Sequence, residues 1–263
     1  MNSKFSLTTK EGKSYEIDLP TPNSCFESKF VFSFAKSGST LLNDLLFTYC
    51  PQLNVPVVSV YDQAFLQGVN THEVGEEVEP ILKKEGYLFS GFRHFPNFDF
   101  STGKNKVVLL VRDPRDMVVS RYYSMAKSHI IPKGVDFLKK NREKAQLMSI
   151  DDFAVQHIKT YVAQQKKYAS ALEAGTQKVY RYEDVIYEKE NWLSDILDYL
   201  EIDRNPSLIR SVVKKFDVIP EAENEDLHIR QVHPGNYKKK LKPETIEHIS
   251  NLASDFLRAF NYD

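Results

Sequence analysis

An apolar run that stops at a polar loop constrains the fold of this chain more than any other stretch. The run, Phe30–Phe34, is rich in aromatic and β-branched residues, as buried strands are. The polar loop that follows is Lys36–Thr40, and after it leucines recur at helical spacing, at Leu41, Leu42, Leu45 and Leu46. The sequence therefore predicts a strand, a tight loop and a helix in direct succession.

A loop of this kind is suited to hold an anion. The first N–H groups of a helix have no partner inside the helix, and the helix dipole places positive potential there. Gly38 allows close approach of the backbone, Lys36 adds a mobile positive charge, and hydroxyl groups come from Ser37, Ser39 and Thr40. The order differs from the Walker phosphate loop, where glycine precedes the lysine. An ordinary helix cap with a solvated lysine would explain the same residues, so the anion site needs support from elsewhere in the chain.

Further apolar runs alternate with helical patterns along the chain. Strands are predicted at 87–91, 106–111 and 177–181, and helices after Asp113 and at 73–84, 151–172, 189–200, 206–215 and 243–260. Residues 1–29 are predicted to be a lead-in with a short hairpin, 51–68 to be irregular, and 128–150 to be a loop or a loosely helical lid. We expect an α/β fold: one P-loop-like domain over 1–263, with a central, mostly parallel sheet flanked by helices.

Charge and cysteine content narrow the classes of function. The 35 Lys and Arg residues nearly balance 36 Asp and Glu residues, which disfavours nucleic-acid binding through bulk charge. Cys25 and Cys50 lack metal-ligand spacing, and neither a bilayer-spanning apolar segment nor a signal-peptide core is recognisable. We therefore expect a soluble, cytoplasmic protein without nucleic-acid or membrane partners, in which a local cluster holds the anion.

Arg112 and Ser120 form a second candidate anion site. Arg112 leaves the end of a predicted buried strand, and Ser120 lies two turns into the helix for which Asp113 is a suitable N-cap. A guanidinium group at this point can bind an oxyanion through two hydrogen bonds. On this stretch alone, surface pairing of the arginines with Asp113 and Asp116 would be the simpler explanation. Together with the Lys36 loop, the pattern predicts a ligand with phosphate at two separated places.

In this order and separation, the two stretches resemble the sulfotransferase superfamily that uses 3′-phosphoadenosine 5′-phosphosulfate (PAPS), in particular its cytosolic, small-molecule members. The family's first motif, Tyr-Pro-Lys-Ser-Gly-Thr-Thr-Trp, binds the 5′-phosphosulfate and stands here as Phe-Ala-Lys-Ser-Gly-Ser-Thr-Leu over residues 34–41. In the second motif an Arg, and a Ser eight positions later, bind the 3′-phosphate, and Arg112 and Ser120 match that spacing. The resemblance implies PAPS as cofactor, with contacts from Lys36, Ser37, Gly38, Ser39, Thr40, Leu41, Arg112 and Ser120.

Four later segments extend the resemblance across most of the chain. His94-Phe95-Pro96 is similar to the segment that carries the family's catalytic base, which implies that His94 is the base and that Lys36 assists. Tyr-Glu-Asp begins at Tyr182, a phenylalanine like the one that stacks on adenine is found at position 216, and the late basic loop begins at Arg230. The cofactor contacts implied by these segments are Tyr182, Phe216, Arg230, Gly235 and Lys238.

The sequence departs from the family pattern at three positions. The tryptophan of the first motif is Leu41, and the first glycine of the late loop is Val232. The lysine two positions before the base is Phe92, so its charge would have to come from Arg93 or Lys36. The dimerisation segment of the cytosolic animal enzymes is not recognisable, and the oligomeric state is left open.

These patterns predict sulfuryl transfer from PAPS to a hydroxyl or amine of a small acceptor in specialised metabolism, with His94 as general base and no metal. The product would be 3′-phosphoadenosine 5′-phosphate (PAP). The acceptor pocket is predicted to be bordered by Tyr61, Phe92, Arg93, Phe95 and Tyr123. Two alternatives remain open: a small-molecule kinase with an aberrant phosphate loop, in which Asp113 would be the metal-binding acid, and a non-catalytic nucleotide-binding protein.

Overall fold

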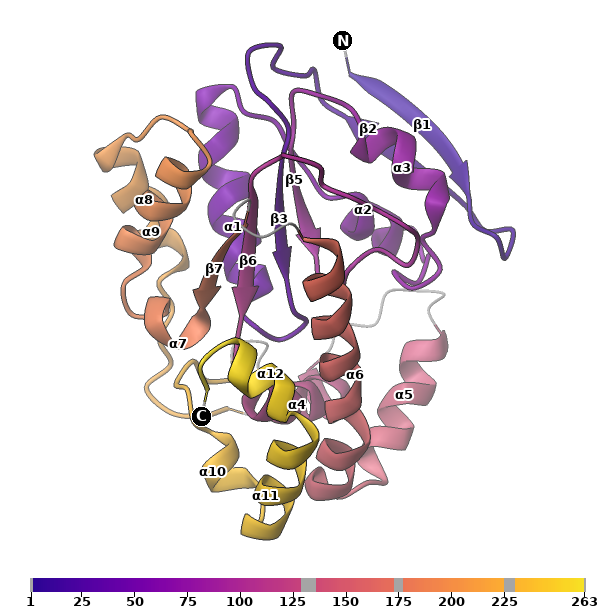
Figure 1. The fold of residues 1–263 in the computed structure, drawn as a ribbon, viewed down its shortest axis with the longest axis vertical. Helices are drawn as coiled ribbons and strands as arrows, with labels where there is room; N and C mark the ends of the chain where they lie inside the picture. The colour runs from indigo at the N-terminus through magenta and orange to yellow at the C-terminus, as the bar shows by residue number, and fades with distance from the viewer. Residues whose placement is uncertain (1, 129–135, 173–176, 225–229, 263) are drawn as a thin grey trace.

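The computed structural model describes residues 2–128, 136–172, 177–224 and 230–262. At its centre is a five-stranded sheet with strand order β4-β5-β3-β6-β7, in which every pair is parallel (Figure 1). The strands are β3 (Lys29–Ser33), β4 (Val57–Val58), β5 (Leu88–Phe92), β6 (Val107–Val111) and β7 (Gln177–Arg181). The predicted α/β fold with a central parallel sheet flanked by helices is therefore confirmed.

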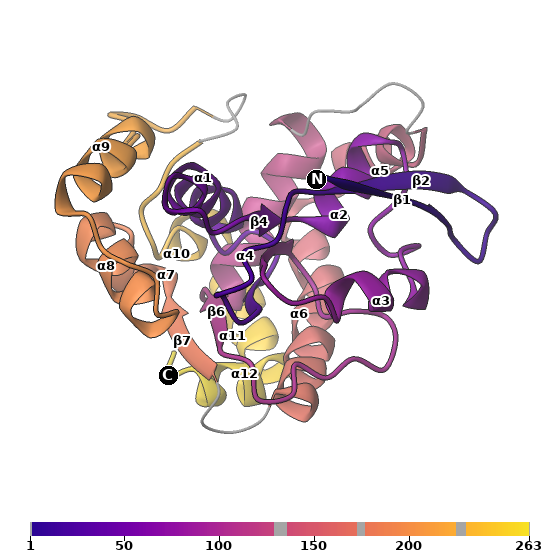
Figure 2. The ribbon, with the colours of Figure 1, turned by 90° about the horizontal axis from the view of Figure 1, so that it is seen from above.

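Side chains of the strands alternate between two apolar clusters, one on each face of the sheet. In β3, Phe30 and Phe32 belong to one cluster and Val31 to the other, because successive residues of a strand point to opposite faces. Helices that cover the Val31 face are α1 (Ser39–Tyr49), α8 (Lys189–Tyr199) and α9 (Pro206–Phe216). Helices that cover the other face are α6 (Ile150–Ala171) and α12 (Ser254–Ala259). Figure 2 shows the sheet between these two layers.

The carboxyl ends of the strands face a third group of helices. This group comprises α4 (Pro114–Tyr123), α7 (Tyr182–Val185), α10 (Tyr237–Lys240) and α11 (Pro243–Leu252). The central strands β3 and β6 pair in register, with Phe30 opposite Val107 and Ser33 opposite Leu110. The loops that leave these two strands therefore lie side by side, at the edge where α/β proteins bind their ligands.

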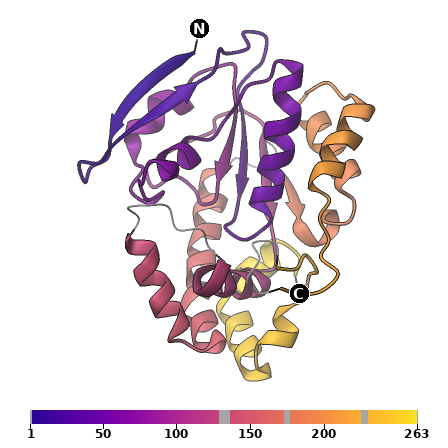
Figure 3. The same ribbon diagram turned by 180° about the vertical axis from the view of Figure 1, so that it is seen from behind.

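A hairpin of β1 (Ser3–Thr8) and β2 (Ser14–Leu19) forms a separate antiparallel sheet, as predicted (Figure 3). It is attached to α2 (Val60–Leu66) by two glutamine side chains one helical turn apart. The amide of Gln67 accepts from the Glu16 N–H at 2.8 Å and donates to its carbonyl at 2.7 Å. Gln63 does the same for Asp18, at 2.8 and 3.2 Å. The glutamines thus take the place of a neighbouring strand for β2.

Two predictions of secondary structure differ from the structure. Residues 51–68 are not irregular, because they contain the 3₁₀ turn η1 (Cys50–Leu53), β4 and α2. Helix α2 begins at an N-cap, where the Ser59 hydroxyl accepts from the Asp62 N–H at 3.2 Å. A cap of this kind is not visible as a periodic pattern of apolar residues in the sequence. In place of the predicted helix 73–84, the structure has the 3₁₀ turn η2 (Glu76–Val78) and the short helix α3 (Glu79–Leu82). Pro80 lies in the first turn of α3, where a proline is tolerated.

Two further segments were predicted only in part. Within 128–150, residues 129–135 lie outside the described ranges, whereas α5 (Asp136–Gln146) is a regular helix that buries Ala145. It follows a π-helical turn, η3 (Ser124–Ser128). The predicted C-terminal helix 243–260 is divided into α11 and α12 at Ala253, whose dihedral angles depart from those of a helix.

Candidate functional site

The loop between β3 and α1 has the conformation of an anion cradle. Lys36 has a φ of 73° and Gly38 a φ of 96°, so two left-handed residues turn the chain sharply before α1. Within the described chain, no side chain caps α1, which leaves the N–H groups of its first turn available. Ser37 is buried, and its hydroxyl donates to the Phe34 carbonyl at 2.8 Å. Ser39 is buried at the start of α1, and Thr40 is exposed.

Tyr182, at the end of β7, closes one side of this loop. A Cβ on Gly38 would lie 2.8 Å from the Tyr182 ring, so only glycine fits at this point. The Tyr182 hydroxyl donates to the carbonyl of Val232 at 2.8 Å, which ties the late loop to the ring. Leu41 and Phe216 both pack against the apolar cluster that contains Tyr182 and Val232. The residues predicted to hold a base are thus brought to one side of the loop.

Arg112, at the end of β6, is buried beside the cradle. Its guanidinium lies over the Tyr182 ring at 4.4 Å, and one nitrogen is 3.5 Å from the carbonyl oxygen of Lys36. Its Nε is buried and has no partner among the described residues. A second nitrogen donates to Asp116 at 3.2 Å. The arginine is therefore fixed in place while part of its hydrogen-bonding capacity stays open.

Asp116 is a buried hub that the sequence prediction missed. Its carboxylate accepts from Arg112 and also from the backbone N–H groups of Gly235, at 2.7 Å, and Tyr237, at 2.9 Å. Only 1% of Asp116 is exposed. Ser120 follows four residues later on α4 and is partly exposed. The spacing of four residues between Arg112 and Asp116 was the available signal, but it was interpreted as surface pairing.

Arg230 approaches from the late loop. It forms an ion pair with Glu223 and lies over the ring of Tyr123 at 4.3 Å. Tyr123, predicted to border the acceptor, therefore lies beside the late loop, where Lys240 also contacts its ring at 5.2 Å. Lys238 is exposed on α10, and among the described residues no contact joins it to the Lys36 loop.

Positive charge is concentrated around Lys36. Burial of its ammonium group, together with the charges of neighbouring arginines, lowers the pKa of Lys36 to about 8. The arginines that contribute are Arg112, Arg93, Arg121 and Arg230. A cluster of five like charges is electrostatically unfavourable in isolation, and a polyanion would relieve the repulsion. The arrangement is therefore suited to bind phosphate or sulfate groups.

His94 lies at the end of β5, next to the same loop. Its Nδ1 is 3.1 Å from the carbonyl oxygen of Phe95. Because a carbonyl can only accept, Nδ1 carries the proton in the neutral ring and Nε2 keeps its lone pair. The ring packs edge-on to Tyr61 at 5.2 Å and is stacked on His72 at 4.6 Å, with an angle of 20° between the planes. His72 was not singled out from the sequence.

The environment of His94 keeps the imidazole neutral. Burial, and then the adjacent His72, lower the pKa of His94 to about 4, whereas its hydrogen bond to Phe95 raises it. A neutral ring with a free Nε2 can accept a proton over a wide pH range.

The other residues predicted for the acceptor pocket are fully or partly buried around the end of β5. Phe92 and Phe95 are buried in the core, with ring centroids 4.4 and 5.6 Å from that of Phe32. Arg93 forms an ion pair with Asp62, and the Ser59 hydroxyl donates to the same carboxylate at 2.9 Å. The buried Tyr61 hydroxyl has no partner among the described residues.

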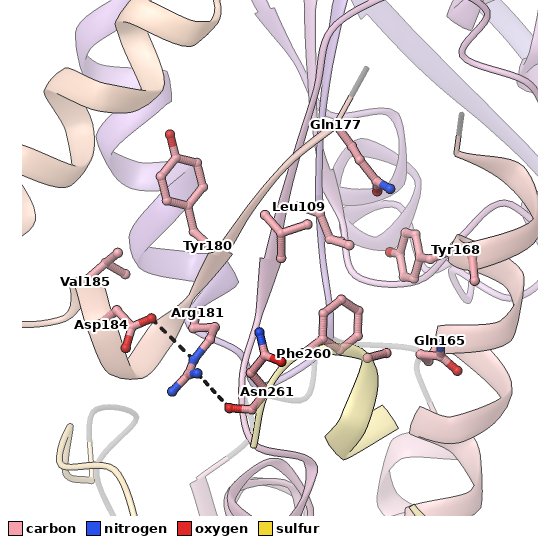
Figure 4. Close-up of a pocket in the computed structure, with 13 residues that line it drawn as sticks. Leu109, Gln165, Tyr168, Gln177, Tyr180, Arg181, Asp184, Val185, Phe260 and Asn261 are labelled. Carbon is pink, nitrogen blue, oxygen red and sulfur yellow. Dashed lines mark hydrogen bonds and ion pairs between the residues drawn. The ribbon is translucent and has the colours of Figure 1, made fainter. Parts of the chain in front are cut away.

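A separate cavity of about 450 Å³ opens between β7, α6 and the end of α12 (Figure 4). Its edge is held by Arg181, which donates to the Asn261 carbonyl at 2.7 Å and pairs with Asp184 at 3.3 Å. Tyr168, Gln165 and Phe260 line the opposite side. None of the predicted site residues lines this cavity, which extends along β7 as far as Arg181 at the carboxyl end of that strand.

Comparisons with known proteins identify the family. A family model described as "Sulfotransferase domain" matches residues 27–254. The search of curated proteins found no match. No helix in the described ranges is both long and apolar enough to cross a membrane.

Solved structures with the same fold have low sequence identity to this chain. Mouse sulfotransferase SULT7A1 complexed with PAP has a TM-score of 0.58 and 12% identity, over 92% of this chain and 87% of that chain. Retinol dehydratase with retinol and PAP has a TM-score of 0.50 and 13% identity, over 97% and 90%. Its structure with androsterone and PAP has a TM-score of 0.52, with the same identity and coverage. Because the family model covers most of the sequence, this chain belongs to the sulfotransferase family.

Proposed function

We propose that this chain transfers the sulfuryl group of PAPS to a hydroxyl or amine of a small, partly apolar acceptor in specialised metabolism. The observation that carries the proposal is the convergence of two anion sites at the ends of adjacent strands. The Lys36 loop leaves β3 and Arg112 leaves β6, and burial, followed by the charges of Arg112 and three other arginines, lowers the pKa of Lys36. A ligand with anionic groups at both ends fits this arrangement.

The residues present fit PAPS. The unpartnered Nε of Arg112, with Ser120 and Arg230, would hold the 3′-phosphate. The Lys36 loop and the first turn of α1 would hold the 5′-phosphosulfate. On the Tyr182 side, the apolar cluster would take the adenine, with Leu41 and Phe216 at its edge. The late-loop residues Gly235 and Lys238 would border the nucleotide. PAPS supplies the activated sulfuryl group, and the protein supplies position and charge.

His94 and Lys36 divide the chemical work in this proposal. Nε2 of His94 accepts the proton of the acceptor hydroxyl or amine, since Nδ1 is fixed by the Phe95 carbonyl. Lys36, when protonated, neutralises the negative charge that develops on the departing 5′-phosphate. Tyr61 and His72 pack against His94 and would border a small acceptor.

The kinase alternative is disfavoured by the position of Asp113. Its carboxylate caps α4 through the Arg115 N–H at 2.9 Å and binds the Arg115 guanidinium at 2.7 Å. An acid that binds a metal in phosphoryl transfer would have to give up both contacts.

Calorimetric titration with PAP, without added metal, tests the proposed function. We expect binding that requires the 3′-phosphate, so that ADP and adenosine 5′-phosphate bind at least about tenfold more weakly. ATP binding that depends on Mg²⁺ would contradict the proposal and favour a kinase.

The same titration reports on Lys36. With a pKa of about 8, Lys36 is largely deprotonated in the free protein above that pH, whereas a polyanion favours its charged form. Binding of PAP above pH 8 should therefore take up a proton and weaken as pH rises. Buffers of different ionisation enthalpy measure this uptake, and uptake that persists in Lys36→Met would assign it to another group.

His94→Ala should lower the rate of sulfuryl transfer by about 10²–10⁴-fold, which is the usual contribution of a general base. The wild-type rate should stay constant from neutral pH down to about pH 5 and fall as His94 is protonated near its pKa of about 4. Transfer from PAPS to a panel of alcohols and phenols that includes retinol and androsterone gives the measurement. Affinity for PAP, the control, should stay within about twofold, since His94 is not placed on the nucleotide. An unchanged rate in the variant would remove His94 from the mechanism.

A further inference from the structure

Arg121 is a cation for which the sites described so far give no role. It occupies the last turn of α4, directly after Ser120. The Tyr161 hydroxyl on α6 donates to the Met117 carbonyl of α4 at 3.5 Å. Burial raises the pKa of that hydroxyl, and the charge of Arg121 opposes the rise, so the guanidinium lies toward α6.

The position of Arg121 relates it to both halves of the site. Its charge lowers the pKa of Lys36, in the anion cradle, and of His72, the ring that is stacked on His94. The guanidinium is therefore within electrostatic reach of the Lys36 ammonium group and of the imidazole that is stacked on His94.

Part of the Arg121 guanidinium is left without a partner. Its Nε is buried and has no hydrogen-bond acceptor among the described residues, and within those residues no carboxylate pairs with it. Nearly all buried N–H groups in proteins are paired, so this donor indicates an acceptor that a ligand supplies. In the same structure Arg112 has the same open Nε, at the proposed phosphate site.

Other candidates for this role are already engaged or carry no charge. Phe92 is apolar and packed in the core. Arg93 is paired with Asp62. Arg230 is paired with Glu223 on the late-loop side.

On the basis of the proposed function, we propose that Arg121 binds an oxygen of the sulfuryl group during its transfer from PAPS. As the acceptor oxygen or nitrogen forms its bond to sulfur, the bond from sulfur to the 5′-phosphate breaks and its electron pair leaves with the phosphate. His94 Nε2 takes the acceptor proton, and Arg121 stays protonated throughout. Its role is to donate a hydrogen bond to a sulfuryl oxygen and to offset the negative charge on that group during transfer.

A comparison of PAP and PAPS binding tests this assignment, because the two ligands differ only by the sulfuryl group. Arg121→Gln should leave the Kd for PAP within about twofold and raise the Kd for PAPS about tenfold, with partial recovery in Arg121→Lys. The neighbouring variant Ser120→Ala should weaken both ligands equally, since it belongs to the 3′-phosphate site. Arg258→Gln, a change at a residue whose side chain is 71% exposed, should alter neither affinity.

Each result has a definite meaning. An equal loss for PAP and PAPS in Arg121→Gln would place Arg121 on a phosphate, and equal affinities in both variants and the wild type would make it structural; either outcome overturns the assignment. Failure of the wild-type protein to bind either ligand would instead overturn the proposed function. If Arg121→Gln does not fold, the PAPS-to-PAP affinity ratio of Arg121→Lys decides, and an unchanged ratio overturns the assignment.

Discussion

Arg112→Ala should weaken PAP binding by about 10²–10³-fold, because hydrogen bonds from a fixed guanidinium to phosphate are among the strongest in proteins. The side chain is only 6% exposed and is already oriented by Tyr182 and Asp116, so little entropy is lost when a ligand binds. Arg112→Lys retains the charge but not the planar fork, and should recover only part of the affinity. Calorimetric titration at fixed ionic strength gives the measurement.

Arg115→Ala is the matched control for this prediction. Arg115 also pairs with an aspartate, Asp113, and lies over a tyrosine ring, that of Tyr237 at 4.6 Å. It is not part of the proposed phosphate site, so its loss should change PAP affinity by less than about threefold. Equal losses in the two variants would mean that disturbance of α4, and not a lost phosphate ligand, explains the effect of Arg112→Ala.

Asp116→Ala should lower the free energy of unfolding by about 3–5 kcal/mol, the usual cost of removing one partner of a buried ion pair. The substitution leaves Arg112 buried without its counter-ion and also removes the acceptor of two backbone N–H groups, those of Gly235 and Tyr237. For a chain of this size the melting temperature should fall by roughly 10 °C. Thermal and urea denaturation without ligand measure the loss.

Two further variants, Asp116→Asn and Asp255→Ala, serve as controls for the loss of stability expected in Asp116→Ala. The asparagine keeps one acceptor oxygen and should show an intermediate loss. Asp255, whose side chain is 65% exposed on α12, should tolerate alanine within about 0.5 kcal/mol. Saturating PAP should restore part of the stability of Asp116→Ala, because its 3′-phosphate would supply a counter-charge to Arg112. A melting temperature equal to that of the wild type would show that Asp116 is not the anchor of the late loop.

The parts of the fold that could be predicted are those indicated by a periodic apolar pattern or by a few neighbouring residues. The strand before Lys36, the cap at Asp113 and the long helix α6 each follow from an apolar period or from a few neighbouring residues. Helix α2 could not be predicted in this way, since it has seven residues and its stability depends on packing.

The site was predictable where a motif carries it and not where distant loops meet. Asp116 binds N–H groups more than a hundred residues later in the chain, so no local pattern indicates its role. His72 meets His94 only because of the path that residues 68–75 take after α2. Burial of the ammonium group, and then four arginines from three distant stretches of the chain, lower the pKa of Lys36. Such properties arise from tertiary structure and are absent from any single stretch of sequence.

The amide ladder between β2 and α2 joins the hairpin to the side of the site proposed for the acceptor. Helix α2 carries Tyr61 against His94, and Gln63 and Gln67 tie it to the backbone of a hairpin that, among the described residues, pairs with no strand of the central sheet. The ion pair of Asp62 with Arg93 and the contact of Tyr61 with Phe92 tie the same helix to the end of β5. Under the proposed function, a change in the hairpin would reach the acceptor through two glutamines, whereas the Lys36 loop extends directly from a strand at the centre of the sheet.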